Sequence, residues 1–346
     1  TATEEIIPGE GVTEVRMLSD YFPDLAGTAG DTQIYVLQGE QEGGSCLILG
    51  GTHANELGGH MGAVLFVENA KVEAGTLYVI PRTNNSAFTH NDPQEGHPST
   101  VHITTDEGNV REFIHGSRAT NPVDQWPDPD VYVNYMGQSL SGSENRNINR
   151  TYPGKADGTL TEMMSYGIVQ LINTENIDVT VDLHEASPEY PVINALIAHE
   201  RAMNLASNVV VDMQMEGVQI SLEPSPTDLR GLTHRELGDH TDTLALLMEA
   251  PNPAQGRLRD RTDEALVLTG KSETYVKAGE IGQLYVPYDE NGWPIEVRCA
   301  RHVFGIERIL ANYSEMYEEP IIVTGMPSYD ELVKNGMGPY LNEPTT

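Results

Sequence analysis

Short apolar runs alternate with amphipathic stretches along most of the chain. The apolar runs predict strands over Gln33–Leu37, Cys46–Leu49, Thr76–Ile80, Asp178–Leu183, Val192–Ile197, Val218–Leu222 and Thr243–Met248. Helical spacing predicts helices over Glu56–Ala70, Leu160–Asn173, His199–Gln214, Arg257–Ala278 and Arg301–Tyr317. This alternation predicts an α/β fold with a mixed, mostly parallel central sheet and helices on both faces.

The stretch 82–158 interrupts this rhythm, because it is rich in Pro, Gly, Asn, Asp and His. A segment this long without periodicity is usually a functional loop or disordered. Its aromatic residues, Trp126, Tyr132 and Tyr135, favour ordered packing. We therefore expect one domain over 1–346, with a core at 30–255, a long loop insertion at 82–158 and a mainly helical part at 256–346.

Charge limits the possible partners. The chain has 346 residues, with 20 Lys and Arg against 52 Asp and Glu, and its formal net charge is −32. Such a charge repels phosphate backbones and anionic lipid surfaces, so we expect no nucleic acid and no membrane as a partner. The acidic surface fits high salt, acidic surroundings or a need for solubility.

The two cysteines do not form a disulfide framework. Cys46 lies in an apolar run, which predicts a buried free thiol rather than a bridge to Cys299. The chain begins at Thr1 rather than Met, which fits a removed leader peptide or a trimmed sequence. Its location stays open, with export slightly favoured.

A first candidate site follows the strand at Cys46–Leu49. His53 and Glu56 lie in Gly50-Gly51-Thr52-His53-Ala54-Asn55-Glu56, between that strand and a helix. Loops at the carboxyl ends of strands bind ligands in open α/β sheets, and imidazole and carboxylate groups are good zinc ligands. The spacing of three predicts that both side chains share one face of a helical turn. The alternative is a solvated loop and a Glu favoured by the helix dipole.

Two further strand ends carry ionisable residues. His184 follows Asp178–Leu183 and would complete a His₂Glu set with His53 and Glu56, which is a catalytic zinc arrangement. Its alternative is a core or loop histidine. Glu249 ends the apolar run at Thr243–Met248, where a carboxylate needs a partner or a function, such as moving a proton. Its alternative is exposure to solvent.

A basic, Asn-rich loop forms the last signal. Arg146, Asn149 and Arg150 lie in Glu144–Gly154, in a chain with only 20 basic residues. Because guanidinium groups bind carboxylates in a bidentate way, this loop predicts an anion site. The alternative is a loop whose Asn side chains cap turns. His234 and His240 precede the Glu249 strand and are further candidates to line a pocket.

Together these motifs resemble the zinc carboxypeptidase-like superfamily, in particular its succinylglutamate desuccinylase/aspartoacylase family. The resemblance covers roughly residues 45–255 and rests on the order of the motifs: His53 and Glu56, then Asn149-Arg150 with Tyr152-Pro153-Gly154, then His184, then Glu249. It implies zinc held by His53, Glu56 and His184. It also implies that Asn149 and Arg150 bind a substrate carboxylate, that Glu249 is the general base and acid, and that Arg118 or Arg146 polarises the scissile carbonyl, with Arg118 preferred.

The resemblance implies a zinc-dependent hydrolase that cleaves an amide next to a carboxylate, in an N-acyl amino acid. The alternatives are a metallocarboxypeptidase, which needs an open groove for a peptide, and a non-catalytic zinc-binding module, against which Glu249 argues. The expected partner is an acyl-amino acid or a short peptide, and the chain could form a homo-oligomer. No G-x-S-x-G or P-loop motif is present, so a serine hydrolase or a P-loop enzyme is not supported.

Overall fold

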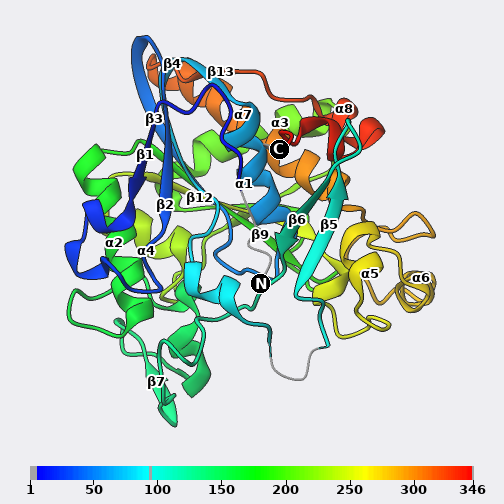
Figure 1. Cartoon of the computed structure of the whole chain (residues 1–346), viewed down its shortest axis with the longest axis horizontal. Coiled ribbons are helices and arrows are strands. Elements are labelled where there is room, and N and C mark those ends of the chain that lie inside the picture. Colours follow the sequence, from blue (N-terminus) through cyan, green and yellow to red (C-terminus); the bar gives the residue numbers. More distant parts are fainter. Residues whose placement is uncertain (1–5, 93–95, 345–346) are drawn as a thin grey trace.

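A mixed β-sheet runs through the centre of the molecule. The computed structural model describes residues 6–92 and 96–344. The strand order in this part of the chain is β1-β2-β4-β3-β9-β12-β10-β11, and β13 pairs with β4 (Figure 1). The four central strands β4, β3, β9 and β12 are mutually parallel, whereas β1, β2 and β13 pair antiparallel. The structure therefore confirms the predicted mixed α/β class.

The strands of the main sheet are β1 (Glu14–Met17), β2 (Gln33–Gln38), β3 (Gln41–Leu49), β4 (Lys71–Ile80), β9 (Val179–Ala186), β10 (Ala195–Ala198), β11 (Ser221–Pro224), β12 (Leu244–Pro251) and β13 (Ile322–Thr324). The helices are α1 (Leu57–Asn69), α2 (Leu160–Glu175), α3 (Met203–Met215), α4 (Thr233–His240), α5 (Glu264–Thr269), α6 (Glu273–Glu280), α7 (Ile295–Tyr317) and α8 (Tyr329–Asn335). None of the helices in the described ranges is long and apolar enough to span a bilayer.

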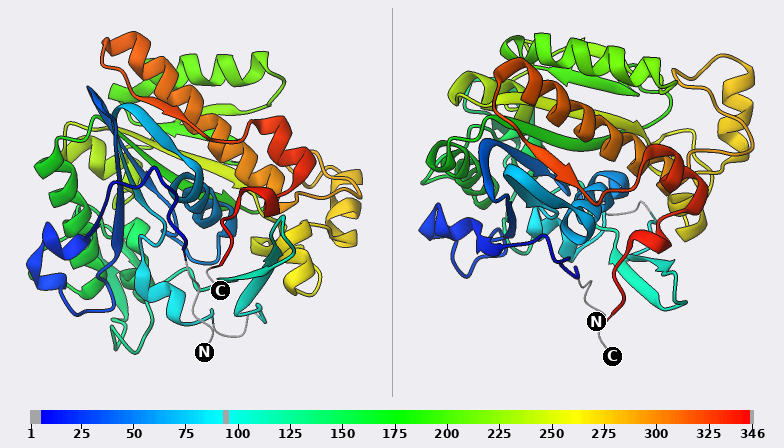
Figure 2. Two further views of the ribbon diagram at one scale, coloured as in Figure 1. Left: turned by 45° about the horizontal axis from the view of Figure 1, so that its top comes forward. Right: turned by 90° about the horizontal axis from the view of Figure 1, so that it is seen from above.

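Helices cover both faces of the sheet, as Figure 2 shows for α1, α3 and α7 on one side. Alternate residues of β3 explain why: Cys46 and Ile48 join the core under α1, α3 and α7, whereas Leu47 and Leu49 join the core under α2. Successive side chains of a strand point to opposite faces, so a strand that is apolar throughout requires cover on both. Cys46 and Cys299 are both buried and free, which confirms the buried free thiol expected at Cys46.

Most predicted elements are present, but their ends differ. The stretch Arg257–Ala278 was predicted as one helix. It instead contains α5, which begins only at Glu264, and most of α6, which begins at Glu273. Asp263 and Ser272 each cap a helix start, and Gly270 ends α5 in the left-handed region (φ +59°). Capping side chains and a glycine with positive φ are what divide one helical pattern into two.

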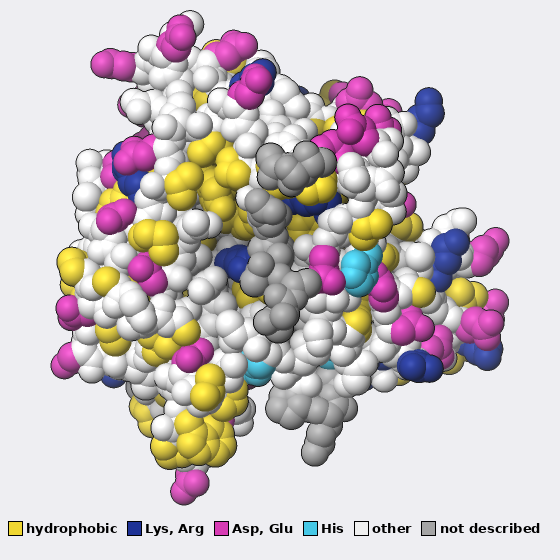
Figure 3. Space-filling model, in the orientation of Figure 1, with side chains coloured by type: hydrophobic (Ala, Val, Ile, Leu, Met, Phe, Trp, Pro, Cys, Tyr) yellow, Lys and Arg dark blue, Asp and Glu magenta, His cyan; other side chains and the backbone are white. Residues whose placement is uncertain are grey.

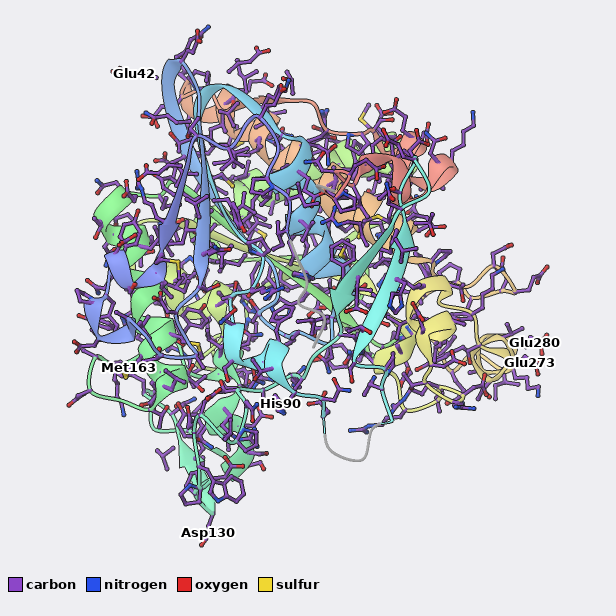
Figure 4. All side chains as sticks on the ribbon, in the orientation of Figure 1. Glu42, His90, Asp130, Met163, Glu273 and Glu280 are labelled. Carbon is purple, nitrogen blue, oxygen red and sulfur yellow. The ribbon has the colours of Figure 1, made fainter. Side chains whose placement is uncertain are left out.

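The stretch 82–158 is ordered where it is described and contains two small hairpins. One pairs β5 (Thr100–Thr104) with β6 (Val110–Ile114), and the other pairs β7 (Val131–Val133) with β8 (Ser139–Ser141). The second hairpin projects from the body and gathers apolar side chains at its surface, as Figure 3 shows at the lower edge. Asp130, directly before β7, lies at the lower extremity of the molecule, and Glu42, Glu273 and Glu280 lie at other extremities (Figure 4), so acidic side chains mark the periphery.

Candidate metal centre

Three predicted residues meet at the carboxyl ends of the central strands. The ligand atoms of His53, Glu56 and His184 all lie within 4.8 Å of one another, and all three side chains are buried. Nδ1 of His53 is 2.7 Å from one Glu56 carboxylate oxygen, and Nδ1 of His184 is 3.0 Å from the other. The group therefore presents two ring nitrogens and a carboxylate to one point, a donor set suited to zinc.

Two local features position these side chains: a tight turn between His53 and Glu56, and the close packing of α1 against β9. The Glu56 amide donates to the His53 carbonyl oxygen at 3.1 Å, and α1 begins only after Glu56. The two residues are thus brought together by a turn rather than by the helix itself. Gly59 on α1 lies so close to β9 that an added Cβ would be 2.2 Å from the Leu183 carbonyl oxygen. This close packing brings Glu56 against His184, and the Glu185 amide donates to Glu56 at 3.0 Å.

Each histidine donates a hydrogen bond from Nε2, the ring nitrogen that faces away from Glu56. Nε2 of His184 donates to Asp182 at 2.8 Å, and Nε2 of His53 donates to the Asn147 side-chain oxygen at 2.9 Å. These bonds fix both rings with Nδ1 directed at Glu56. Metal-binding histidines almost always have such a partner on the other nitrogen. Neither Asp182 nor Asn147 was identified from the sequence.

The charges of the site also favour a cation. Burial would raise the pKa of Glu56 and of Asp182, but the neighbouring imidazoles outweigh it and hold both pKa values below their ordinary range. Burial lowers the pKa of His53, with the charge of Arg118 acting in the same direction, so this ring is neutral. A divalent ion would balance two buried carboxylates beside imidazole nitrogens, and the donor set of two imidazoles and a carboxylate fits zinc.

Glu249 reaches the same site from β12, where it is paired in register with His184 of β9. It is half-buried, and its buried Oε2 atom has no hydrogen-bond partner within the described ranges. Burial raises the pKa of this carboxyl to about 8, against the opposing charge of His184. A carboxyl group without a structural partner and with a pKa near neutrality is suited to proton transfer.

A cavity of about 480 Å³ opens beside these residues. His53, Glu56, His184 and Glu249 line it together with three further predicted residues, Arg118, Asn149 and Arg150. Such a volume is typical of small-molecule sites. His234 also lines the cavity, whereas His240 is not among its lining residues.

The predicted arginines occupy different environments. Arg118 places Nη1 3.6 Å from the Glu56 carboxylate, and its side chain is 40% exposed toward the cavity. Arg150 is 3.5 Å from Glu144, and burial, followed by the charge of Arg118, lowers its pKa. Arg146 lies outside the cavity lining, because Asp128 binds its guanidinium at 2.7 and 3.0 Å. Of the two candidates for polarising a carbonyl, the structure brings only Arg118 beside the His₂Glu group.

Thr233, at the start of α4, joins the two halves of the site. Its hydroxyl lies 2.5 Å from Asp182 Oδ2 and 2.7 Å from the Asn149 side-chain oxygen, and its amide donates to that same oxygen. The Asn149 amide NH₂ group is then free to face the cavity. Thr233 thus links Asp182, the hydrogen-bond partner of His184, to the loop that carries Asn149 and Arg150.

The fold and site together define a mixed α/β protein with a buried His₂Glu group at the strand ends that could hold a metal ion. No model of a protein family matches the chain, and no curated protein matches it.

Several solved structures are similar to the chain in fold. The chain is similar to a succinylglutamate desuccinylase from Silicibacter sp. TM1040, with 16% identity, a TM-score of 0.46, and coverage of 86% of this chain and 63% of that one. It is also similar to a metallo-carboxypeptidase from Burkholderia cenocepacia, with 12% identity, a TM-score of 0.49, and coverage of 89% and 66%. A succinylglutamate desuccinylase/aspartoacylase from Rhodobacter sphaeroides matches with 14% identity, a TM-score of 0.45, and coverage of 87% and 61%.

Each of these matches spans less than two thirds of the solved chain. At 12–16% identity, these likenesses concern the fold.

Proposed function

We propose that the protein is a zinc-dependent hydrolase that cleaves an amide bond next to a carboxylate, in an N-acyl amino acid. One observation carries this proposal: a buried His₂Glu group, the half-buried Glu249 carboxyl group with its unpartnered Oε2, and the guanidinium groups of Arg118 and Arg150 line one cavity. Metal ligands, a proton carrier and anion-binding groups are what amide hydrolysis beside a carboxylate requires.

His53, Glu56 and His184 would hold the zinc ion, with Asp182 and Asn147 fixing the two rings. When bound, zinc supplies a Lewis acid for the scissile carbonyl and activates water. Asp182 keeps His184 in the tautomer whose Nδ1 is available as a ligand.

The other residues would bind the substrate and move protons. Arg150 and the Asn149 amide would bind the substrate carboxylate, and this orients the amide bond. Arg118, beside Glu56, would stabilise the negative charge that develops on the carbonyl oxygen. Glu249 would take a proton from the attacking water and pass it to the leaving amine.

The cavity favours a small substrate over a long peptide. A volume of about 480 Å³ accommodates an acyl-amino acid. A carboxypeptidase would use the same groups but would have to accommodate residues on the far side of the scissile bond. Activity on blocked dipeptides that exceeds activity on acetyl-amino acids would therefore assign the chain to the peptidase class.

The test compares an acetyl-amino acid with its methyl ester, using zinc-loaded wild type, Arg150→Ala and Arg150→Lys. Losing a charged hydrogen-bonding partner costs about 1.5–3 kcal/mol, which is about ten- to a hundredfold in kcat/KM. Wild type should prefer the free acid, and both variants should lose this preference, because Lys cannot form the bidentate contact. Arg257→Ala removes an exposed charge that does not line the cavity and should behave as wild type. Equal hydrolysis of acid and ester by wild type would rule out the proposed carboxylate contact.

A further inference from the structure

A second carboxylate lines the cavity at a distance from the His₂Glu group. Glu223 is half-buried on β11, the last strand on its side of the sheet, and its side chain lines the cavity. No hydrogen bond or ion pair binds its carboxylate among the residues that the structure describes. None of the steps proposed above uses it.

The sheet register defines what lies between Glu223 and the metal centre. Asp182 pairs with Leu247, Leu247 with Ile197, and Ile197 with Glu223, across β9, β12, β10 and β11. Residues paired in this way point to the same face of a sheet. Because neighbouring strands lie about 4.8 Å apart, Glu223 begins about 10 Å beyond Leu247 and about 14 Å beyond Asp182.

The floor and walls of this part of the cavity are apolar. Leu247 and Ile197 form the floor, and Val192, Leu229 and Leu232 line the walls. An aliphatic chain fits this surface, and a group at the end of such a chain would meet Glu223. A half-buried carboxylate at the end of an apolar passage is stabilised by a cation rather than by an apolar group or another anion.

Both arginines that line the cavity lie at one end of it. Arg118 lies beside Glu56. After burial, the charge of Arg118 is the largest factor that lowers the pKa of Arg150, so the two arginines lie near each other at the end of the cavity that contains the His₂Glu group. Glu223 lies three strands from β9. The cavity thus suits a molecule with a carboxylate at one end, a short aliphatic chain and a positive charge at the other.

We propose that Glu223 determines the substrate class: the amino-acid part carries an aliphatic side chain that ends in an ammonium group, as in an Nα-acyl derivative of lysine or a shorter diamino acid. This inference rests on the function proposed above. An uncharged side chain of equal length would leave Glu223 without a partner, and an acidic side chain would be repelled by it.

A binding experiment tests the recognition independently of turnover. Titration calorimetry would compare L-lysine with L-norleucine, which has a similar aliphatic chain and no ammonium group, on the zinc-loaded full chain. We expect wild type to bind lysine about ten- to a hundredfold more tightly. Glu223→Gln should bind both amino acids equally, with norleucine affinity unchanged, and Glu223→Ala serves if the Gln variant does not fold.

A matched control removes a nearby charge that does not line the cavity. Asp228 lies on the loop that follows β11, and the Asp228→Asn variant should keep the preference for lysine. Equal affinities for lysine and norleucine in wild type, no binding of either, or a preference that persists in both Glu223 variants would overturn the proposal.

A hydrolysis experiment separates this proposal from the proposed function. Nα-acetyl-lysine and Nα-acetyl-norleucine would be compared by kcat/KM in wild type and Glu223→Gln. Hydrolysis of both at equal rates would retain the hydrolase and overturn the specificity. Lysine-selective binding without hydrolysis of either compound would retain the recognition by Glu223 and overturn the hydrolase.

Discussion

Asp182 offers a sharp test of how the candidate metal centre is built, because the substitution Asp182→Asn keeps its size and removes its charge. One oxygen of this buried carboxylate accepts from Nε2 of His184 at 2.8 Å and from Thr233 at 2.5 Å, and the other accepts from Thr52 at 2.7 Å. An Asn side chain retains one acceptor oxygen and replaces the other with an NH₂ group. At least one of these donors would therefore lose its acceptor.

The size of the effect follows from these contacts. Losing the outer partner of a metal-binding histidine weakens metal affinity by about 10–100-fold, or about 1.4–2.8 kcal/mol. A buried donor left without an acceptor costs about 1–3 kcal/mol of folding stability. We expect Asp182→Asn to bind zinc about 10–100-fold more weakly and to unfold at a lower urea concentration.

The assay is competition for zinc against a chromophoric chelator near neutral pH, with urea unfolding of the same samples. Asp178→Asn is the matched control, because Asp178 precedes the same strand and accepts from Ser45 at 2.7 and 3.0 Å, far from the ligands. It should affect stability and leave zinc affinity unchanged. If Asp182→Asn bound zinc as tightly as wild type while His184→Ala lost it, the role given to Asp182 would be refuted.

Three further outcomes are expected. His53→Ala should lose the one zinc ion that elemental analysis is expected to find per chain, and a metal content equal to wild type would exclude His53 as a ligand. Glu249→Gln should keep zinc and fold but lose about 10²–10⁴-fold in kcat, and a small loss with zinc bound would show that Glu249 is not the proton carrier. Burial lowers the pKa of His234 to about 3, so its contribution to stability is complete above pH 6.5, the ordinary value, and is lost as pH falls toward 3. Urea unfolding of the metal-free protein across this range should show a slope that His234→Gln reduces, and an unchanged slope would contradict this assignment.

The sequence allowed much of the sheet to be predicted, because strands buried on both faces are apolar throughout. It was less informative about where elements end. The break between α5 and α6 depends on two capping side chains and Gly270, which were overlooked beside a strong helical pattern. The strand predicted over Val192–Ile197 begins only at Ala195, because Asn194 adopts a left-handed backbone (φ +47°).

The outer residues of the site were also missed, for two different reasons. Asp182 lies two residues before His184, so strand periodicity places both side chains on one face, and this signal was present in the sequence. Asn147 contacts His53 across 94 residues, and Thr233 contacts Asn149 across 84. No local pattern carries such contacts, because they arise only when the loop insertion and α4 pack against the sheet.

Thr233 donates through its hydroxyl to Asp182 and through its backbone amide to Asn149, and these two bonds have a thermodynamic consequence. They connect Asp182, which orients His184, to Asn149, which lines the cavity, so ordering one side reduces the freedom of the other. If metal binding raises substrate affinity through this connection, substrate must raise metal affinity by the same factor, since linkage is reciprocal. The protein would then retain its zinc ion most firmly while substrate is bound, and Thr233→Val would reduce this mutual stabilisation.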